Sequence, residues 1–330
     1  MSLHRTPGNC WTQPVLAICP NPTIDRLVIL DTLVPGTVDR VRRNRAYPAG
    51  KSVSAARGCL ANGAAPRVHV LLPNSGSDWY LDTLRVEGMD VTSHACDGSV
   101  RESIIVIEDG GRVTVLNGPG APVSEARWDD FVQASIAGLR PGEWVICSGS
   151  FPPGVGPEAL AGLVAAIAAT GARLALDTGP AWMPLALRGP ALPTLITPNL
   201  AEAEAILTGE TSPEATGVGD DALARAAGAA AGLHERGIRS VVVTAGSAGL
   251  AWATRDGAGV LPGQKVKVRN PIGAGDAFLG GLVSRLEAGL DFADAAGWGM
   301  ATSCAAIEQW SPGGAPAQRV AHFHDLITAS

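Results

Sequence analysis

Short apolar runs alternate along the chain with longer segments that have helical periodicity. Short runs rich in β-forming residues are typical of strands buried in a parallel sheet. We predict six such strands, at residues 15–19, 68–72, 144–148, 173–177, 195–197 and 240–244. The segments between them repeat apolar residues at helical spacing or open with helix-starting residues. They predict helices at residues 52–62, 78–87, 124–137, 157–170, 201–208 and 220–235.

This alternation of strands and helices indicates βαβ units. Parallel strands that are joined through helices form one sheet with helices on both faces. We therefore expect an α/β fold with a mostly parallel central sheet. Ligands of such open sheets bind outside the carboxyl ends of the strands, so candidate site residues are sought there.

Two segments break the alternation. Residues 26–46 alternate apolar and polar positions around Pro35-Gly36, and residues 103–116 form two alternating runs joined by Asp109-Gly110-Gly111, a hairpin signal. Both segments are too polar for the central sheet, so we expect a small β-sheet that acts as a lid over one edge of the main domain. The main domain then comprises residues 14–25, 47–100 and 119–330, and the inserted lid comprises residues 26–46 and 101–118.

The composition is that of a globular protein. Of 330 residues, 46% are hydrophobic and 17% are charged, which allows a buried core and argues against intrinsic disorder. The 41 glycines and 24 prolines make up nearly one fifth of the chain, above the average of about 12% but below the roughly 25–30% of low-complexity sequences. The net charge of −6 argues against general binding to nucleic acids or membrane surfaces, which needs a positive field.

The cysteines and the N-terminus indicate a cytoplasmic protein. The six cysteines, Cys10 among them, are scattered without a C-x-x-C pair or a metal-binding spacing, which is typical of free thiols in a reducing compartment. Residues 1–14 are polar and contain Pro7, Gly8 and Pro14, so we expect no signal peptide. The most apolar stretch, residues 160–169, is far shorter than the ~20 residues that span a bilayer.

The sharpest local feature is a glycine turn that leads into an amphipathic helix, at residues 270–282. Gly273 and Gly275 allow a ligand to approach the backbone closely, and the amides at a helix N-terminus bind anions. Asp276 stands at the same opening, where a carboxylate can take a proton from a hydroxyl that attacks a bound phosphoryl group. On these residues alone, a helix N-cap is an equally good interpretation of Asp276.

Five ordered motifs accompany this Gly-Ala-Gly-Asp turn. They are NPTID at 21–25, AGK at 49–51, SGSFPPG at 148–154, PNLAE at 198–202, and TAG at 244–246, which continues to Gly249. With them the sequence resembles the PfkB/ribokinase-type carbohydrate kinases over roughly residues 15–327, and in particular the hexose-phosphate branch of 1-phosphofructokinase and tagatose-6-phosphate kinase. The resemblance implies a ribokinase-like three-layer fold, ATP as phosphoryl donor and Mg²⁺ as cofactor.

The resemblance also implies the roles of individual residues. In the phosphoryl-transfer step, the base is Asp276, and the migrating group is held by Gly273, Ala274 and Gly275. The acceptor is bound by Asp25, Gly50, Lys51, Ser54, Arg101 and Ser150. The nucleotide is bound by Thr244, Gly246, Gly249 and Asn199, and Mg²⁺ is organised through waters by Glu202.

For three of these residues, the chemistry of the side chain also supports a role in binding the acceptor, independently of the resemblance. Asp25 follows the first strand, where a carboxylate can accept hydrogen bonds from sugar hydroxyls. Lys51 opens a helix in a chain with only three lysines, and a flexible point charge there suits a phosphate. Arg101 enters the second lid hairpin, and its planar guanidinium suits a phosphate too. The simpler alternatives are an Asx turn for Asp25, a surface lysine and an exposed hairpin charge.

Two further motifs have equally simple local alternatives. Asn199 and Glu202 have the spacing of a capping pair at the start of a helix. Gly246 and Gly249 are explained just as well by a tight turn between two strands. Both alternatives remain open from the sequence.

Departures from the branch pattern affect the sugar side. Ser54 stands where the branch has an asparagine that contacts the sugar, and Ser103 stands where it often has asparagine. A hydroxyl cannot make the two-sided hydrogen bonds of an amide. Pro271 replaces a threonine before the glycine turn, which removes an amide but should preserve an extended entry. The catalytic half of the pattern is intact, so the identity of the sugar is the open question.

We therefore expect an ATP-dependent kinase that converts fructose 1-phosphate to fructose 1,6-bisphosphate. The alternatives are tagatose 6-phosphate, fructose 6-phosphate, or an unphosphorylated sugar or nucleoside as acceptor, and a sugar-phosphate-binding regulator without catalysis. We expect apolar lid residues, namely Val28, Leu30 and Val41, to be exposed, which predicts a homodimer in which two lids pair.

Overall fold

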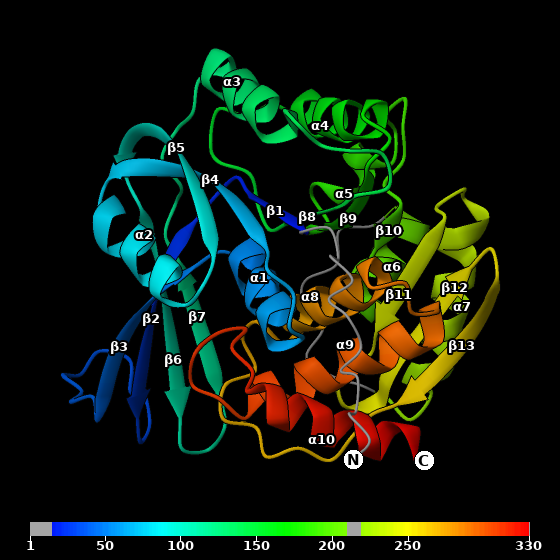
Figure 1. The fold of residues 1–330 in the computed structure, drawn as a ribbon. Helices are drawn as coiled ribbons and strands as arrows, with labels where there is room; N and C mark the ends of the chain where they lie inside the picture. The colour runs from blue at the N-terminus through cyan, green and yellow to red at the C-terminus, as the bar shows by residue number, and fades with distance from the viewer. Residues whose placement is uncertain (1–14, 210–218, 330) are drawn as a thin grey trace, which may run out of the picture.

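The chain forms two separate sheets in the computed structural model, which describes residues 15–209 and 219–329 (Figure 1). The predictions for residues 1–14, including Cys10, lie outside the described residues. Within these ranges the larger sheet has nine strands. In spatial order they are β13 (Gly257–Pro262), β12 (Gly249–Thr254), β11 (Ser240–Thr244), β10 (Leu195–Ile196), β9 (Arg173–Asp177), β8 (Trp144–Ser148), β1 (Leu16–Cys19), β4 (Arg67–Ser75) and β5 (Asp90–Ser99).

Neighbouring strands from β11 to β5 are parallel, and β12 and β13 add an antiparallel hairpin at one edge. All six strands predicted from the sequence are present and parallel to one another. In β1, Leu16 and Ile18 pack on one side of the sheet, and Ala17 and Cys19 pack on the other. Burial of both faces explains why these strands appear in the sequence as continuous apolar runs.

Helices cover both faces of the large sheet, so the main body has three layers (Figure 1). One layer contains α3 (Glu125–Ile136), α4 (Pro157–Ala169), the short α5 (Met183–Ala186), α6 (Leu200–Thr208) and α7 (Ala222–Glu235). The other contains α1 (Lys51–Ala61), α2 (Ser77–Val86), α8 (Ala274–Glu287), α9 (Phe292–Ile307) and α10 (Ala317–Thr328). The predicted three-layer α/β fold is therefore confirmed.

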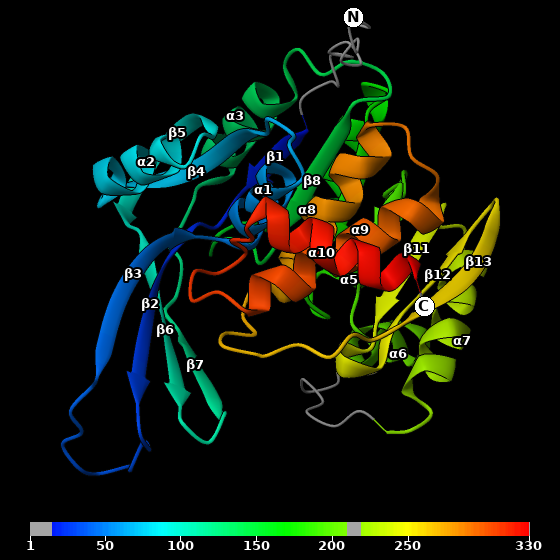
Figure 2. The same ribbon diagram turned by 60° about the horizontal axis from the view of Figure 1, so that its bottom comes forward.

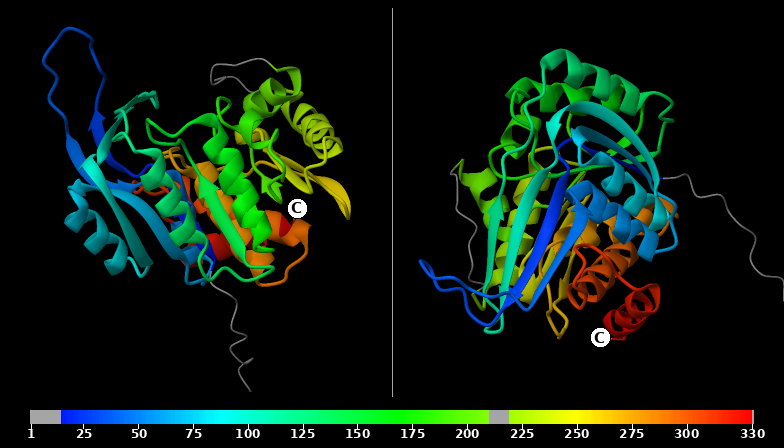
Figure 3. Two further views of the ribbon diagram at one scale, coloured as in Figure 1. Left: turned by 90° about the horizontal axis from the view of Figure 1, so that it is seen from above. Right: turned by 90° about the vertical axis from the view of Figure 1, so that its left-hand side faces the viewer.

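The smaller sheet extends away from the main body (Figures 2 and 3). In the described residues it has four strands, in the order β3 (Arg43–Ala49), β2 (Thr23–Leu30), β6 (Arg101–Glu108) and β7 (Val113–Asn117). It consists of two antiparallel hairpins joined by the parallel pair β2 and β6. The prediction of a separate small sheet is thus confirmed.

The inner face of the small sheet packs on the main body. Its buried core is a cluster of Leu27, Ile29, Ile105 and Ile107, against which Ile272 and Trp310 pack. One predicted detail is wrong, because Leu30 is buried with 4% of its surface exposed. Val41 is exposed as predicted, and Val28 is half-buried.

Several elements were not predicted, namely β5, β12, β13, α5, α9 and α10. The strands among them lie at the two edges of the large sheet, where β5 is mostly exposed and has Cys96 as its buried residue. An edge strand is only partly buried, so it lacks the apolar run by which the central strands were found.

The described thiols are all buried and free, at Cys19, Cys59, Cys96, Cys147 and Cys304. Burial raises the pKa of each of them, for example that of Cys304 to about 11. Thiols in this state are poor nucleophiles and pack as small apolar groups. None of the helices in the described ranges is both long enough and apolar enough to cross a membrane.

Candidate active site

Candidate site residues converge at the carboxyl ends of β8 and β9, which lie side by side in the large sheet. Ser148 is the last residue of β8, and Asp177 is the last residue of β9. Lys51 from the first turn of α1 and Asp276 from the first turn of α8 reach the same point. This is where open α/β sheets bind their ligands.

The turn before α8 requires glycine. Gly273 is the N-cap of the helix with a φ of 84°, and a Cβ at this position would lie 2.7 Å from the backbone nitrogen of Gly313. No side chain of the described residues caps this helix, so its N-terminus is accessible to an anion, although the amide of Ala274 already donates to the carbonyl oxygen of Pro271 at 3.3 Å. Asp276 is the third residue of α8. The N-cap interpretation of this aspartate is therefore wrong.

The Asp276 carboxyl group is buried, with 7% of the residue exposed. Burial raises its pKa to about 7, Lys51 lowers this pKa, and Asp177 and Asp25 raise it further. Its Oδ1 lies 3.5 Å from the hydroxyl oxygen of Ser148. A carboxylate with a pKa near neutrality is well suited to remove a proton from a hydroxyl.

Lys51 is paired with a carboxylate that the sequence interpretation missed. Its Nζ lies 3.5 Å from Oδ2 of Asp177, and 46% of its side chain is exposed. Asp177 raises the pKa of the Lys51 ammonium, and Asp276 and Glu202 add to the effect. The Ser148 hydroxyl donates a hydrogen bond of 3.0 Å to the same Oδ2 of Asp177. Asp177 ends a predicted strand at the ligand side of the sheet, and that position was the signal for it.

Asp25 lies on β2 and is buried at 6% exposure. Burial raises its pKa to about 6, although Arg101 and Arg57 lower it. Arg57 was not predicted as a site residue, because it lies within the mostly apolar helix α1. Its guanidinium is anchored by Glu87 and by the carbonyl oxygen of Pro48, at 2.7 Å in each case.

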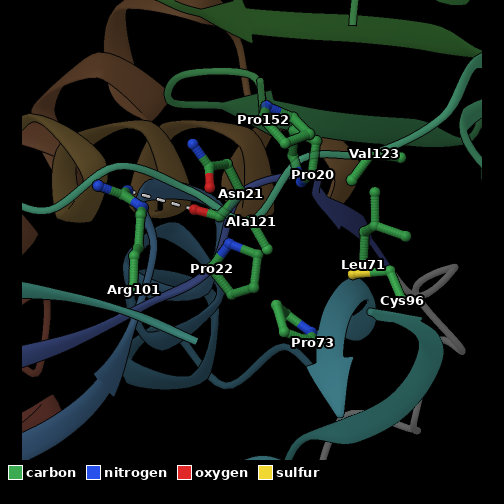
Figure 4. A pocket seen from close by; sticks show the side chains of 10 residues that line it. All are labelled: Pro20, Asn21, Pro22, Leu71, Pro73, Cys96, Arg101, Ala121, Val123 and Pro152. Carbon is green, nitrogen blue, oxygen red and sulfur yellow. Dashed lines mark hydrogen bonds between the residues drawn. The ribbon is translucent and has the colours of Figure 1, made fainter. Parts of the chain in front are cut away.

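Arg101 lies at the start of β6 and lines a small pocket with Asn21 (Figure 4). Its Nη2 donates to the carbonyl oxygen of Asn21 at 3.2 Å, whereas its buried Nε has no hydrogen-bond partner among the described residues. Burial lowers the pKa of the Arg101 guanidinium. The side chain of Asn21 donates to the exposed Ser150 hydroxyl at 3.0 Å. An unpaired donor on a buried guanidinium favours an anionic ligand.

Two other predicted acceptor residues lie at the start of α1. Gly50 is the N-cap of this helix with a φ of 131°, and a Cβ there would lie 2.7 Å from Cys19 Sγ. Ser54 is buried and packs against Gly313. Ser103, the second altered position, donates to the amide oxygen of Asn117 at 2.8 Å.

A cleft of about 740 Å³ adjoins the N-terminal turn of α8. Its lining includes Ala274 and Gly275 from that turn, and Thr244, Gly246 and Gly249 from the segment predicted to bind nucleotide. The sequence interpretation missed its apolar wall, which is formed by Phe278, Met300, Cys304 and Ile307 together with Ser303. A cleft of this size with one apolar wall can hold a nucleotide.

The structure also supports the alternative interpretation of Gly249, in which the backbone conformation requires a glycine. Its φ is 119°, and a Cβ there would lie 2.0 Å from the carbonyl oxygen of Leu261, on the neighbouring strand. Glycine is therefore required for the β12–β13 pairing, whatever it contributes to the cleft.

Asn199 and Glu202 form a capping box at the start of α6. The Asn199 side chain accepts from the amide of Glu202, and the Glu202 side chain accepts from the amide of Asn199, both at 2.9 Å. The side chains of Asn199 and Glu202 therefore cap the helix, as the simpler alternative predicted. Asn199 also bridges to Thr244 at the edge of the cleft. The described part of the chain contains no cluster of three or more His, Cys, Asp or Glu side chains that could hold a metal ion.

A buried carboxylate beside an open helix N-terminus and a nucleotide-sized cleft defines a small-molecule kinase. A model of the pfkB family carbohydrate kinases matches residues 20–317, so the chain belongs to this family. It is therefore a carbohydrate kinase, an enzyme that transfers a phosphoryl group to an alcohol, and ATP is the donor that this family implies.

Curated relatives extend over most of the chain. It is 30% identical over 320 residues to the 1-phosphofructokinase of Rhodobacter capsulatus, covering 96% of this chain and 98% of the relative. It is 29% identical over 302 residues to the 1-phosphofructokinase of Haemophilus influenzae, covering 91% and 92% of the two chains. These similarities support a kinase of the hexose-phosphate type.

Solved structures confirm the ribokinase-like fold. Phosphofructokinase-2 from Escherichia coli has a TM-score of 0.85 at 20% identity, over 96% of this chain and 99% of that chain. Ribokinase from Thermotoga maritima has a TM-score of 0.70 at 16% identity, over 94% and 99% of the two chains.

Proposed function

We propose that this enzyme phosphorylates a ketohexose phosphate with ATP and that its acceptor is fructose 1-phosphate, which it converts to fructose 1,6-bisphosphate. One observation carries the proposal: the buried Asp276 lies beside the open amides of α8, with the charged pair of Asp25 and Arg101 on the small-sheet side. This arrangement offers a base, an anion site and a cation for a second phosphate. The names of the curated relatives agree with such an acceptor.

In the proposed reaction, Asp276 removes the proton of the acceptor hydroxyl as that oxygen attacks the γ-phosphorus of ATP. The amides of Gly273, Ala274 and Gly275 hold the migrating phosphoryl group. Amides fixed at a helix N-terminus stabilise developing charge at no cost of reorganisation. The Lys51 ammonium, 3.5 Å from Asp177, supplies a positive charge beside the transferred group.

The acceptor lies between the two sheets in this proposal. Asp25 accepts hydrogen bonds from sugar hydroxyls, and Arg101 binds the phosphate that the acceptor already carries. The unpaired Nε of Arg101 supports this role, because a phosphate would satisfy it. Gly50, Ser54 and Ser150 complete the sugar site.

ATP occupies the cleft of about 740 Å³, with its base against the apolar wall and its phosphates toward Gly275. Thr244, Gly246 and Gly249 also line this cleft. Asn199 contributes through its bridge to Thr244 rather than through direct contact.

Mg²⁺ would be held through water by Glu202, whose carboxylate is near enough to the site to raise the pKa of Lys51. The described residues lack a cluster of ligating side chains. This fits a magnesium ion that keeps most of its waters and is held mainly by phosphate oxygens. The ion would neutralise charge on the nucleotide phosphates.

The small sheet serves as a lid, with the boundaries 26–46 and 101–118, and two lids pair in a homodimer. Val34, Val38 and Val41 in the β2–β3 connection are exposed, Val38 at 94%, which supports an apolar contact there. Val38→Asp should convert a dimer to a monomer in light scattering. A wild-type monomer at working concentration would contradict the pairing.

A panel of acceptors tests the proposed substrate. ADP release is measured with fructose 1-phosphate, fructose 6-phosphate, tagatose 6-phosphate, fructose, ribose and a nucleoside. We expect the highest kcat/KM with fructose 1-phosphate. A higher value with tagatose 6-phosphate or fructose 6-phosphate would change the acceptor and keep the chemistry.

Arg101 is tested on the same panel. Arg101→Ala should raise KM for the sugar phosphate on the order of 10-fold or more and leave KM for ATP unchanged, because it removes a charge-assisted contact. Arg85→Ala removes an exposed arginine that is paired with Asp82 and should change neither constant. A neutral sugar as best acceptor, unaffected by Arg101→Ala, would overturn the phosphate site.

A further inference from the structure

The hydroxyl of Ser148 lies between the carboxylates of two residues. It is 3.0 Å from Oδ2 of Asp177 and 3.5 Å from Oδ1 of Asp276. All three side chains are buried, with residue exposures of 3% for Ser148 and 7% for each aspartate. Asp276 is the proposed base, whereas nothing in the proposed reaction so far uses Ser148 or Asp177.

A serine hydroxyl has one proton, so it can donate to only one of the two carboxylates at a time. The shorter contact assigns this proton to Asp177. The Ser148 oxygen then presents lone pairs to Asp276, which is favourable when Asp276 carries a proton. Asp276 gains such a proton when it acts as the base.

The backbone that carries the Ser148 hydroxyl is held in place by hydrogen bonds. The backbone amide of Ser148 donates to Ser52 Oγ at 2.8 Å, and Ser52 Oγ donates to the carbonyl oxygen of Ile18 at 2.6 Å. These bonds tie the end of β8 to α1 and β1. A group held this firmly can serve proton transfer without reorganisation.

We propose that Ser148 passes the proton of the acceptor hydroxyl from Asp276 to Asp177. This inference rests on the proposed function of Asp276 as base. The acceptor O–H bond breaks as its oxygen bonds to phosphorus, and the proton moves to Asp276. In the same concerted step the Asp276 O–H bond breaks as a new O–H bond forms at Ser148, while the original Ser148 proton bonds to Asp177. Ser148 is left unchanged, and Asp276 is again a carboxylate.

Charged groups from three other elements surround Asp276 at one end of the relay. Asp276 faces Lys51 from α1, Asp25 from β2 and Asp177 from β9, and Lys51 contacts Asp177 directly. Because the Lys51 side chain is partly exposed, water can reach this side and accept the proton from Asp177. Ser148 acts through Asp276 and is therefore a positioning residue.

Single-turnover measurements test the relay, because they exclude product release from the rate. They use the full-length enzyme, ATP and the best acceptor of the panel. Ser148→Ala should slow phosphoryl transfer by about 10-fold or more and change either KM by less than about two-fold. Ser148→Thr keeps the hydroxyl and should restore most of the rate. Ser135→Ala removes an equally buried hydroxyl that has no hydrogen-bond partner and should change nothing.

A double-mutant cycle separates the relay from a structural role. Asp177→Asn can still accept the hydrogen bond from Ser148 but cannot take a proton. It should slow the reaction, and adding Ser148→Ala should cost little more, because either change cuts the same path. The rate in mixtures of H₂O and D₂O should curve with deuterium content for the wild type and be linear for Ser148→Ala.

Two outcomes overturn the relay: a full single-turnover rate in Ser148→Ala, or losses that multiply in the double variant. Thermal unfolding of each variant checks that it is folded, and the Asp177→Asn arm stands even where a residue 148 variant is unstable. Asp276→Asn is measured alongside. An inactive Asp276→Asn with a fully active Ser148→Ala refutes the relay alone, whereas an active Asp276→Asn refutes the proposed base itself.

Discussion

The Nζ atom of Lys51 lies 3.5 Å from Oδ2 of Asp177, so the first residue of α1 is paired with the last residue of β9. The pair lies next to Asp276, whose pKa Lys51 lowers and Asp177 raises. The carboxyl groups of Asp25, Asp177 and Asp276 therefore share a mostly buried site with the Lys51 ammonium. The balance of these charges sets the pH range in which Asp276 can act as a base, and it leads to the following predictions.

The pH dependence of kcat should follow Asp276. Its pKa is about 7, and a base is active as the carboxylate, so kcat should rise as pH increases through about 7 and level off above it. Asp276→Asn should lower kcat on the order of 10²–10⁴-fold and flatten this profile. Asp129→Asn, an exposed aspartate on α3, serves as the control. Near-full turnover of Asp276→Asn would show that another group is the base.

Burial of the Asp276 carboxylate should lower the stability of the folded chain at pH values above the pKa of this group. In the folded state the pKa is about 7, against 3.8 for a solvent-exposed aspartate, so the folded chain holds a proton that the unfolded chain has lost between these pH values. Stability contributed by this group is therefore lost as pH rises through that window. Asp276→Asn should raise the melting temperature at pH 8 and leave it nearly unchanged at pH 4.

The expected gain at pH 8 is on the order of 1–3 kcal/mol in the free energy of unfolding, which corresponds to a rise of several degrees. Calorimetry at the two pH values measures it, with Asp129→Asn again as the control. Equal melting temperatures of Asp276→Asn and the wild type at pH 8 would show that the carboxylate is not destabilising.

Removing the Lys51 charge should shift the pH profile. Lys51→Met takes away the cation that lowers the pKa of Asp276, so the midpoint of kcat against pH should move upward by roughly 1 pH unit or more. Lys51→Arg keeps the charge and should keep the midpoint, with a lower kcat because its geometry differs. The measurement is kcat from about pH 5.5 to about 9.5, a range that extends to both sides of the roughly neutral pKa of the base. An unchanged midpoint in Lys51→Met would separate Lys51 from Asp276.

Filling the cleft should affect ATP alone. Ser303 on α9 lines the cleft beside Met300 and Cys304, and Ser303→Phe places a ring where the base is proposed to bind. KM for ATP should rise by about 10-fold or more, and KM for the acceptor should hold within about two-fold. Ser303→Ala keeps the cleft open and should match the wild type. A larger effect on the acceptor than on ATP would place the nucleotide elsewhere.

Much of the fold could be predicted because it depends on local pattern. Strands β8, β9 and β11 begin and end where the apolar runs do. The turn at Gly273 could be predicted too, since only glycine readily adopts its positive φ. The edge strand β5 escaped prediction because an edge position removes the selection for apolar residues on both faces.

Local pattern failed where one sequence serves two purposes. The spacing of Asn199 and Glu202 fits both a capping box and a magnesium site, and the structure shows the capping box. Arg57 in its apolar helix gave no signal of its own, yet it reaches Pro48 and Glu87. The apolar wall of the cleft comes largely from α9, whose residues look like an ordinary helix core until α8 and α9 pack together.

By itself, the sequence determined the layered α/β fold, the small sheet, and the placing of Asp276 at a glycine turn, because strand burial and glycine conformation are written into consecutive residues. Only the tertiary structure decided what surrounds Asp276. Ser148 and Asp177 become neighbours because β8 and β9 pair in register, and Lys51 joins them because α1 begins at the same edge of the sheet. The pKa of a buried carboxylate depends on such through-space neighbours, which no run of consecutive residues records.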